Sequence, residues 1–427
     1  MELTQGQQLA LSAVQSVRNS HPDGGGIVVI GGYAGTGKTT LLRTLAEDEK
    51  LTVLAPTGKA AMRAAEVAPV DASTIHRWLY EVAEDPTTGK LMTTVKDEVV
   101  LPKNRTIFVD EASMVSFRMA RDLYQVCKQN KMNLIFIGDG FQLPPVDFDD
   151  ANKDFSVLAS DFPAHYRVQM TEVVRQALDS PIIRASMDVR DPKSNLGGLS
   201  ELPCIPTGMM IEEGARVFEN GGATIVHRNA TRQALNRDIR KHLGYGEKVL
   251  KGEPLMVLFN NYTIDVYNGE IVEALTAPEL LGTKPVPIKD RFANETMNMW
   301  FYQTKVRCPG GEARILFADR EVYGENGKIG MKPIRKGGED YSRYLMVQER
   351  KEESGSVSYA ELNEIKGLPV LNCNFGYALT AHKAQGSEFP EVLVGIEDSI
   401  RLHSHEGRRW VYTALTRGKK SVKVCWL

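Results

Sequence analysis

The segment Ile27-Val-Val-Ile-Gly-Gly-Tyr-Ala-Gly-Thr-Gly-Lys-Thr-Thr40 decides the fold class of this chain. It opens with a short, β-branched apolar run, which is typical of a strand buried in a sheet. From Gly32 to Thr39 it matches the phosphate-loop pattern G-x-x-x-x-G-K-[ST], and residues 39–48 then have the composition of a helix. A strand, a phosphate loop and a helix in this order predict a parallel α/β sheet that binds phosphate at the carboxyl ends of its strands.

The residues of this loop are suited to hold a nucleoside triphosphate. Glycines let backbone N–H groups surround the phosphates, and the start of the helix adds positive potential. Lys38 is expected to reach the β- and γ-phosphates, and the Thr39 hydroxyl is expected to bind Mg²⁺. The residues that we expect to hold the nucleotide here are Gly35, Thr36, Gly37, Lys38, Thr39 and Thr40.

Two later apolar runs end in polar residues that fit phosphate hydrolysis. Ile107-Phe-Val-Asp110-Glu111 is an expected strand that ends in two acids. We expect Asp110 to hold Mg²⁺ through water, and Glu111 to orient or deprotonate the attacking water. Leu134-Ile-Phe-Ile is followed by a polar loop that contains Gln142. The amide of Gln142 can both donate and accept a hydrogen bond, so it is suited to sense the γ-phosphate.

The remaining chain alternates expected strands and helices, with two interruptions. Alternation of this kind predicts parallel α/β units. Glu84–Leu101 contains a Pro-Thr-Thr-Gly turn and is expected to form a β-hairpin. Residues 276–369 carry frequent turn signals between short β-rich runs, which predicts a small all-β insertion. Further expected strands are Leu51–Ala55, Ala223–Val226, Phe375–Leu379, Glu391–Ile396 and Ser421–Trp426, and further expected helices are Gly58–Val67, Phe117–Asn130 and Thr231–Leu243.

Composition excludes several classes of protein. The chain has 427 residues, of which 42% are hydrophobic and 25% charged, so disordered and collagen-like chains are excluded. The net charge of −2 argues neither for nor against a nucleic-acid partner. The five cysteines are too widely spaced for a zinc knuckle or a C-x-x-C pair. Because there is also no secretory signal and no long apolar run, we expect reduced thiols and a cytoplasmic protein.

Two arginines and several small polar residues complete the candidate sites. Arg175 in MTEVVRQ and Arg417 in YTALTRGKK are suited to act as arginine fingers, which stabilise charge on a transferred phosphoryl group. Hydroxyls and imidazoles that follow strands can grip nucleic-acid phosphates without reading the bases. Taken alone, the segment 73–76 is better explained as a helix N-cap. The candidate DNA contacts are Pro56, Thr57, Thr74, His76, Thr380 and His382.

In chain order, these strings resemble the motifs of superfamily 1 helicases, in particular the B-type, RecD- and Dda-like group. The matching strings are LTQGQ (3–7), GGYAGTGKTT (31–40), VLAPTGKAA (53–61), STIH (73–76), FVDEAS (108–113), GDGFQLPPV (138–146), MTEVVRQ (170–176), YNGE (267–270), LTAHKAQGSEF (379–389) and VYTALTRGKK (411–420). Several of these strings are weak alone, but their common order is specific.

This resemblance implies a fold and a mechanism. ATP would bind between two RecA-like domains with parallel sheets, and opening and closing of that cleft would move the chain 5′→3′ along single-stranded DNA. The hairpin would be the pin that separates the strands, and the β insertion would be an SH3-like domain. The implied bounds are 1–83 with 102–178 for the first RecA-like domain, 84–101 for the pin, 179–275 with 370–427 for the second RecA-like domain, and 276–369 for the SH3-like domain.

The resemblance also implies roles for individual residues. Gln7 would read adenine, and Gly386 and Glu388 would lie at the nucleotide. The hairpin contains no aromatic residue from Glu84 to Leu101, unlike a base-stacking pin. Leu91 and Met92 would therefore have to act as an apolar wedge.

Three functions are compatible with these residues. The first is an ATP- and Mg²⁺-dependent DNA helicase that acts as a monomer on single strands and forks, with a single-strand-binding protein as a further partner. The second is a single-strand translocase that displaces proteins and unwinds little duplex. The third is an ATP-gated nucleic-acid-binding or adaptor protein that hydrolyses slowly; the complete set of catalytic acids and arginines argues against it.

Overall fold

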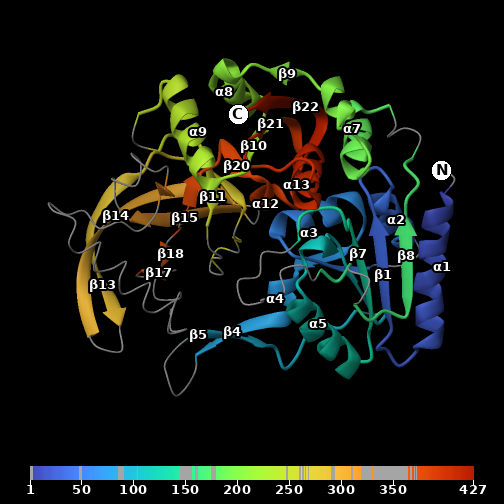
Figure 1. Ribbon diagram of the computed structural model, residues 1–427. Helices are drawn as coiled ribbons and strands as arrows, with labels where there is room; N and C mark the ends of the chain where they lie inside the picture. Colours follow the sequence, from blue (N-terminus) through green and yellow to red (C-terminus); the bar gives the residue numbers. More distant parts are fainter. Residues whose placement is uncertain are drawn as a thin grey trace. The chain divides into compact units, whose positions relative to one another are not determined.

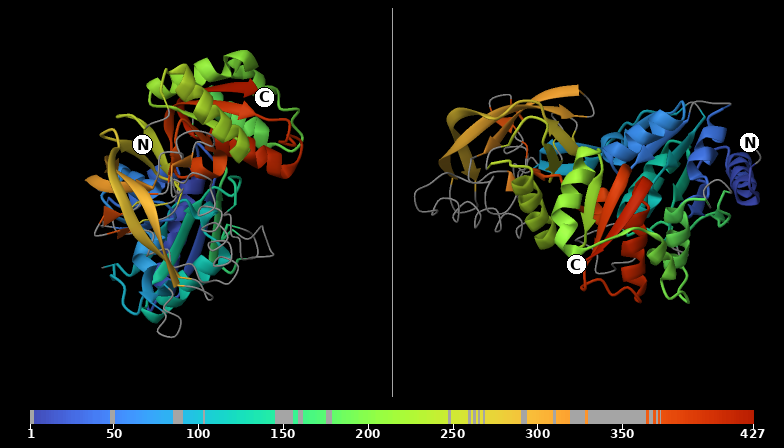
Figure 2. Two further views of the ribbon diagram at one scale, coloured as in Figure 1. Left: turned by 90° about the vertical axis from the view of Figure 1, so that its left-hand side faces the viewer. Right: turned by 90° about the horizontal axis from the view of Figure 1, so that it is seen from above.

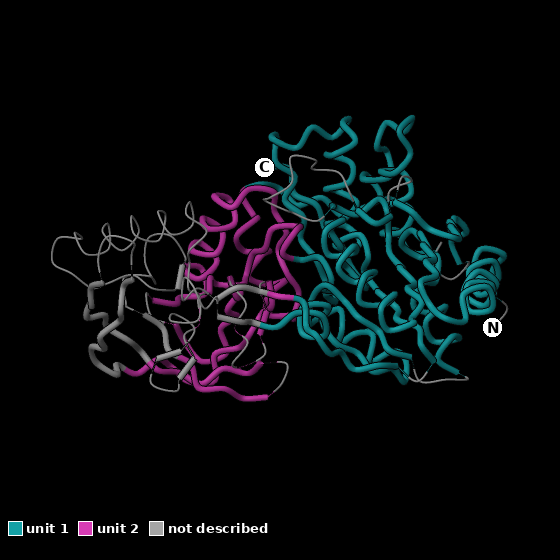
Figure 3. The backbone as a smooth tube through the Cα atoms, turned by 90° about the horizontal axis from the view of Figure 1, so that it is seen from below, with its two compact units in different colours: residues 1–81, 95–207, 384–427 teal, residues 82–94, 208–383 magenta. Residues whose placement is uncertain are grey.

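The computed structural model describes most of the chain as two compact units. The described residues are 3–47, 51–84, 91–102, 104–144, 156–158, 162–174, 179–246, 249–258, 261, 264, 266–267, 269–289, 294–308, 311–318, 328–329, 364–365, 368–369, 371 and 373–427. Unit 1 consists of Met1–Glu81, Val95–Thr207 and Ala384–Leu427, and unit 2 of Val82–Thr94 and Gly208–Lys383 (Figure 3). The chain therefore leaves unit 1 for unit 2 twice, first at residues 82–94 and again at residues 208–383, and returns to unit 1 each time.

Unit 1 contains a six-stranded sheet in which neighbouring strands are parallel, in the order β3-β2-β6-β7-β1-β8 (Figure 1). The strands are β1 (Ile27–Gly32), β2 (Thr52–Ala55), β3 (Asp71–Thr74), β6 (Thr106–Val109), β7 (Asn133–Gly138) and β8 (Tyr166–Met170). The α/β fold class expected from the sequence is confirmed. Because β1, β7 and β6 are consecutive neighbours, the loops that follow them emerge side by side at one edge of the sheet.

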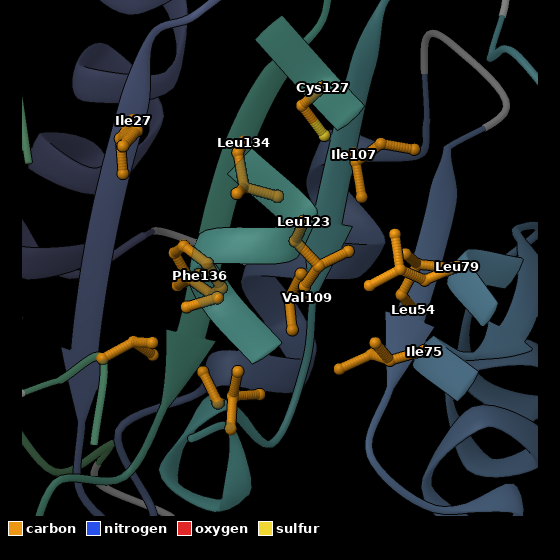
Figure 4. Close-up of a cluster of buried hydrophobic side chains, with 14 of the residues drawn as sticks. Ile27, Leu54, Ile75, Leu79, Ile107, Val109, Leu123, Cys127, Leu134 and Phe136 are labelled. Atoms are coloured by element: carbon orange, nitrogen blue, oxygen red, sulfur yellow. The ribbon is translucent and has the colours of Figure 1, made fainter. Parts of the chain in front are cut away.

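Alternate residues of the central strands belong to two buried clusters on opposite faces of the sheet. In β1, Ile27 and Val29 belong to one buried cluster, and Val28 and Ile30 belong to the other. The first cluster contains residues of α4 (Ile75–Leu79) and α5 (Phe117–Gln129), and Figure 4 shows part of it. The second contains residues of α1 (Gln5–Ser20), α2 (Lys38–Leu45) and α3 (Gly58–Val67). Burial on both faces explains why these strands read as continuous apolar runs.

The last part of unit 1 is a further parallel α/β element. β21 (Phe389–Ile396) pairs in parallel with β22 (Gly418–Trp426), and α13 (His405–Leu415) connects them (Figure 2, red). β22 also pairs in parallel with β9 (Cys204–Ile205). Arg408 of α13 is 5% exposed, and its guanidinium donates to the carbonyl oxygens of Val189, Asp191 and Ser194, which fixes α13 against the end of α7 (Pro181–Arg190).

Unit 2 combines a parallel strand pair with an antiparallel sheet. β10 (Ala223–Val226) pairs in parallel with β20 (Ala378–Thr380), next to α8 (Met210–Glu219) and α9 (Asn229–His242). The antiparallel sheet contains β11 (Pro254–Val257), β12 (Ile271–Ala274), β13 (Glu279–Lys289), β14 (Asn294–Cys308), β15 (Gly311–Ala318), β16 (Lys328–Ile329) and β19 (Cys373–Phe375). The shorter elements of unit 2 are β17 (Glu364–Ile365) and β18 (Leu368–Pro369), and those of unit 1 are η1 (Ala112–Met114) and η2 (Gly197–Glu201). η3 (Thr207–Met209) and α12 (Ala381–Ala384) lie where the chain passes from one unit to the other.

A buried ion pair joins α9 to the antiparallel sheet of unit 2. Arg240 Nε lies 2.6 Å from Glu253 Oε1, and both side chains are at most 5% exposed. The Tyr377 hydroxyl donates to the same oxygen at 2.6 Å. The Arg240 guanidinium also lies 3.8 Å from the centre of the Phe375 ring. Because the charges are paired and hydrogen-bonded, their burial is tolerated, and removal of one partner would be costly.

The expected hairpin forms, but it starts earlier than the sequence suggested. β4 (Tyr80–Glu84) pairs with β5 (Leu91–Val95), so the hairpin spans 80–95 rather than 84–101. Tyr80 ends α4 in an extended conformation, with φ −114° and ψ 150°, so the chain passes directly from helix to strand. Residues 85–90 and the side chains of Leu91 and Met92 lie outside the described residues. The roles of pin, SH3-like domain and domain bounds stay predictions.

Candidate active site

The loop between β1 and α2 has the conformation of a phosphate-binding loop. Gly35 and Gly37 have φ of 78° and 82°, in the left-handed region that only glycine enters without strain. A Cβ on Gly37 would also lie 2.2 Å from Gln7 Nε2. The loop backbone is fixed by Val174, whose N–H donates to Gly35 O at 3.0 Å. The loop glycines are thus required by the backbone conformation and by the close approach of α1.

Gln7 lies against this loop and does not line the pocket described below. Its Oε1 accepts from Thr4 N at 2.9 Å, which completes a capping box at the start of α1. Its Nε2 lies 3.4 Å from Thr36 O and 3.3 Å from Gly37 O, to which it donates. The structure therefore places Gln7 as a support of the phosphate loop, and its role toward adenine stays a prediction.

Lys38, the first residue of α2, folds over the loop. Its Nζ donates to Gly32 O at 2.7 Å and to Tyr33 O at 3.1 Å. Nζ also lies 4.0 Å from Oδ2 of Asp139, a fully buried residue that follows β7. The ammonium group is therefore at the loop, where phosphate oxygens could exchange with these acceptors.

Two acids follow β6, as the sequence predicted. Asp110 Oδ1 accepts from the Glu111 N–H at 2.9 Å. Burial and the neighbouring Glu111 charge raise the pKa of Asp110 to about 6, because both disfavour its charged form. Glu111 has a φ of 52°, a strained value for a residue with a side chain. Its Oε2 is buried and has no hydrogen-bond partner among the described residues. Buried polar atoms are normally hydrogen-bonded, so this oxygen is suited to accept a hydrogen bond from a bound molecule.

These groups line one pocket of about 450 Å³ within unit 1. Gln142, which is 4% exposed, enters it from the loop after β7. The predicted site residues that line the pocket are Gly35, Gly37, Lys38, Thr39, Thr40, Asp110, Glu111, Gln142, Glu388 and Arg417. Thr36 is fully buried behind them. Gly386, with a φ of 70°, instead approaches α3, where an added Cβ would lie 2.7 Å from Thr57 Oγ1.

Arg417 reaches the pocket from the turn between α13 and β22. It is 3% exposed, and its Nε donates to Thr413 O at 3.1 Å. Its Nη1 donates to Ser387 O at 3.2 Å. These bonds hold the guanidinium plane in place, which suits a group that must meet phosphate oxygens in one orientation. Arg175 lies outside the described residues, so its role stays a prediction.

Two cations of this pocket were not predicted from the sequence. Arg63, on α3, lies with Nη2 2.5 Å from Glu388 Oε1 and Nη1 3.9 Å from Glu111 Oε1. Lys419 Nζ lies 3.2 Å from Glu388 Oε2. Arg63 falls one helical turn after Lys59 in the VLAPTGKAA segment, so helical periodicity could have suggested it. Nothing in the sequence distinguishes Lys419 from its neighbour Lys420.

The pocket has oxygen donors suited to Mg²⁺ bound together with ATP. Thr39 and Asp110 both line it. Mg²⁺ at nucleotide sites typically takes one or two protein oxygens, with substrate phosphates and water supplying the rest. In the described part of the chain, no group of three or more His, Cys, Asp and Glu side chains could hold a metal without such a substrate. The residues present therefore fit a metal that arrives with the nucleotide.

The candidate DNA contacts of unit 1 have structural roles as well. Thr57 Oγ1 accepts from Ala60 N and caps α3, and Thr74 Oγ1 accepts from Arg77 N and caps α4. The His76 ring lies 5.5 Å from the Tyr80 ring. Pro56 is half-buried at the end of β2. The N-cap interpretation of segment 73–76 is thus confirmed for Thr74, and contact with DNA stays a prediction.

In unit 2, the remaining DNA candidates lie at the end of β20. Thr380 is its last residue, and His382 follows in α12. Burial and the charges of His227 and Lys383 lower the pKa of His382. Burial and the charge of Arg232 lower the pKa of Lys383 to about 8. Basic side chains thus gather in unit 2 where two parallel strands end.

Among the described helices, none is long and apolar enough to cross a membrane.

Comparisons with known proteins agree with this geometry. An AAA domain model matches residues 2–202, and a UvrD-like helicase C-terminal domain model matches residues 375–425. The chain is 30% identical over 405 residues to the ATP-dependent RecD2 DNA helicase of Deinococcus radiodurans. This alignment covers 92% of the chain and 46% of the relative. It is 24% identical over 473 residues to the ATP-dependent DNA helicase dda of Enterobacteria phage T4, and this alignment covers 99% of the chain and 98% of the relative.

Other matches have different lengths or show the fold alone. The chain covers 36% of an uncharacterised protein of Methanocaldococcus jannaschii, so it spans less than half of this relative and of RecD2. A crystal structure of Bacteroides Pif1 helicase with ADP-AlF3 and single-stranded DNA matches with a TM-score of 0.52 and 19% identity. The match covers 99% of the present chain and 92% of the Pif1 chain. Together with the order of the motifs, the family models and the RecD2 and dda relatives support a B-type, RecD- and Dda-like helicase of superfamily 1.

Proposed function

We propose that this chain is an ATP-dependent DNA helicase that moves 5′→3′ along single-stranded DNA and unwinds duplex. One observation carries the proposal. The phosphate loop, the two acids after β6, Gln142 and Arg417 come from distant parts of the sequence and line one pocket. A slow, ATP-gated adaptor would have no need of a complete set of hydrolytic groups.

In the proposed reaction, Lys38 and the loop amides bind the triphosphate. Thr39 and Asp110 hold Mg²⁺, which neutralises charge on the phosphates. Glu111 orients or deprotonates the attacking water, and Gln142 senses the γ-phosphate. Arg417, with Arg175, stabilises the charge that develops during transfer. The buried Oε2 of Glu111 and the buried Oε1 of Gln142, both without partners among the described residues, support these roles.

The proposed track is single-stranded DNA, and forks are the proposed substrate. Thr57, Thr74 and His76 of unit 1, together with Thr380 and His382 of unit 2, would contact its phosphates without base specificity. ATP binding would close the cleft between the RecA-like domains and release would open it, so that the two DNA grips alternate and the DNA moves. The proposal includes action as a monomer, with a single-strand-binding protein as a further partner.

Direction is tested on two matched duplexes, one with a 5′ single-stranded tail and one with a 3′ tail, with ATP and Mg²⁺. The proposal expects strand separation of the 5′-tailed duplex alone. Separation of the 3′-tailed duplex alone would overturn the direction and leave helicase activity standing. Lys38→Ala, which leaves the phosphate charge uncompensated, serves as the inactive control and should abolish ATP turnover.

A second candidate function is translocation with little unwinding, and one observation favours it. The hairpin of β4 and β5 lacks an aromatic residue from Glu84 onward, so it has no base-stacking wedge. If neither tailed duplex separates while single strands still stimulate ATP hydrolysis, this function replaces the first. Replacement of residues 85–90 by a short Gly-Ser turn should abolish unwinding and spare DNA-stimulated ATP turnover if the hairpin is a pin. A joint loss of both activities would make the hairpin part of the fold.

A further inference from the structure

A fully buried tyrosine, Tyr412 of α13, joins two loops of the nucleotide pocket. Its hydroxyl donates to Asp139 Oδ2 at 2.5 Å and accepts from the Ala34 N–H, in the phosphate loop, at 2.7 Å. A phenol hydroxyl has one proton to donate, so its donor and one acceptor position are both used. The phosphate loop and the loop after β7 thus meet at one atom of the C-terminal helix.

Asp139 is the link between this hydroxyl and the catalytic lysine. Oδ2 of Asp139 receives the Tyr412 hydroxyl and lies 4.0 Å from Lys38 Nζ, and Oδ1 accepts from Phe141 N at 3.0 Å. The Phe141 ring packs edge-to-face against the Tyr412 ring, with ring centres 5.2 Å apart. Asp139 is fully buried, so its charge depends on these few partners. Without the Tyr412 hydroxyl, the negative charge of Asp139 would be compensated mainly by Lys38.

Two neighbours of Tyr412 on α13 hold the same loop. Arg409 Nε donates to Gln142 O at 3.0 Å, and Thr413 Oγ1 accepts from Leu143 N at 3.0 Å. Positions 409, 412 and 413 lie on one face of a helix. Arg417 follows at the end of the same helix and donates to Thr413 O. Thr413, which holds the loop after β7, therefore also holds the proposed arginine finger in the turn after α13.

We propose that Tyr412 is a positioning residue that keeps Lys38 available to the nucleotide. By donating to Asp139, its hydroxyl shares the carboxylate charge and weakens the hold of Asp139 on Lys38. By accepting from Ala34, it fixes the phosphate loop relative to α13. This inference rests on the proposed function, because it assigns Tyr412 to the same ATP site.

Tyr412→Phe tests the inference, because it removes the hydroxyl and keeps the ring. Binding of a fluorescent ATP analogue with Mg²⁺ to the full chain should weaken about tenfold, the size expected for loss of a hydrogen bond to a charged group. The turnover number at saturating ATP should fall less than the affinity does, because Lys38 still reaches the phosphates once ATP is bound. In the double variant with Asp139→Asn, no carboxylate competes for Lys38, and affinity should return to within about threefold of the unchanged protein.

A matched control separates positioning from stability. Tyr377→Phe in unit 2 removes the same type of bond, a buried tyrosine hydroxyl donating to a carboxylate at 2.6 Å, away from the nucleotide pocket. Both single variants should lower the thermal unfolding midpoint. Nucleotide binding should weaken in Tyr412→Phe and stay unchanged in Tyr377→Phe. Unchanged affinity in Tyr412→Phe, or no recovery in the double variant, would overturn the inference.

A further variant covers the case in which Tyr412→Phe does not fold. Asp139→Asn alone should bind the analogue at least as tightly as the unchanged protein, because Lys38 loses a competing partner. Tenfold weaker binding in that variant would overturn the inference. Failure of the proposed function is distinguishable, since in that case the unchanged protein itself would not bind the analogue or turn over ATP.

Discussion

Arg63 bridges two carboxylates of the nucleotide pocket, with Nη2 2.5 Å from Glu388 and Nη1 3.9 Å from Glu111. Glu388 lies in the C-terminal segment of unit 1, more than 300 residues from Arg63 in the chain. Arg63 is therefore the cation through which α3 holds both the acid proposed to activate water and an acid of the C-terminal segment. Its charge also favours ionisation of Asp110.

Arg63→Gln should lower DNA-stimulated ATP turnover about tenfold or more, because Glu111 loses its nearby cation and Glu388 loses a close partner. Steady-state ATP hydrolysis with a single-stranded oligonucleotide measures this. Arg43→Gln, which removes an arginine of α2 whose Nε donates to Val67 O outside the pocket, is the matched control and should leave turnover unchanged. Equal losses in the two variants would contradict the assignment.

Glu111→Gln should retain ATP binding and lose hydrolysis by about 100-fold or more, since the amide matches the carboxylate in shape but cannot take a proton. Single-turnover hydrolysis and equilibrium binding, measured side by side, separate the two effects. Loss of binding would instead mean that Glu111 acts by holding the strained backbone after β6.

Arg417→Ala should reduce turnover about 1,000-fold if its guanidinium stabilises the transferred phosphoryl group. A loss below tenfold would exclude that role. Because Arg417 also donates to Thr413 O and Ser387 O, its removal disturbs local packing as well. Arg417→Lys keeps the positive charge but loses the planar set of guanidinium donors. A comparably large loss of turnover in this variant, with an unchanged unfolding midpoint, would show that the guanidinium geometry is required and that misfolding is not the cause.

Binding of single-stranded DNA should weaken above pH 8 through Lys383. Burial and Arg232 lower its pKa to about 8, so the charge is present at pH 7 and lost as the pH rises toward 9. The affinity for a short oligonucleotide at constant salt should therefore fall by about three- to tenfold over this range. Lys383→Arg stays charged and should abolish the fall. A pH dependence that persists in this variant would rule Lys383 out as its source.

The same shift has a consequence for folding. The unfolded chain holds a proton on Lys383 up to its usual pKa of 10.5, while the folded chain releases it near 8. Between these values the unfolded state binds more protons, so the contribution of Lys383 to the free energy of unfolding rises with pH.

The sequence predicted the residues that act through their own chemistry. Gly37, Lys38 and Asp110 follow strands whose apolar runs are unmistakable, and the parallel sheet brings the ends of those strands together. Arg417 was predicted because it lies in the segment 411–420, which resembles a helicase motif. Each of these predictions depends on a local pattern, and local patterns are what a single sequence displays.

Residues that act through a partner were not predicted. Tyr412 reads as one apolar position of α13, and its hydroxyl acquires a role only because Asp139 is buried beside it. The bonds from the Gln7 amide to the phosphate loop were likewise not predicted, and its role toward adenine stays a prediction. The early start of the hairpin at Tyr80 was missed because a helix as short as α4 leaves no periodicity to mark its end.

The division of unit 1 along the chain affects how the protein is made. The phosphate loop and both acids precede Thr207, whereas Tyr412 and Arg417 follow Ala384, after the whole of unit 2 has been synthesised. During translation, the six-stranded sheet can therefore form while its pocket still lacks the helix that supports Ala34 and Asp139. Because domains tend to fold as they emerge from the ribosome, the nascent chain passes through a stage that has a phosphate loop but not yet Tyr412 or Arg417. If Arg417 acts as proposed, we expect efficient ATP turnover only after α13 and Arg417 have been added.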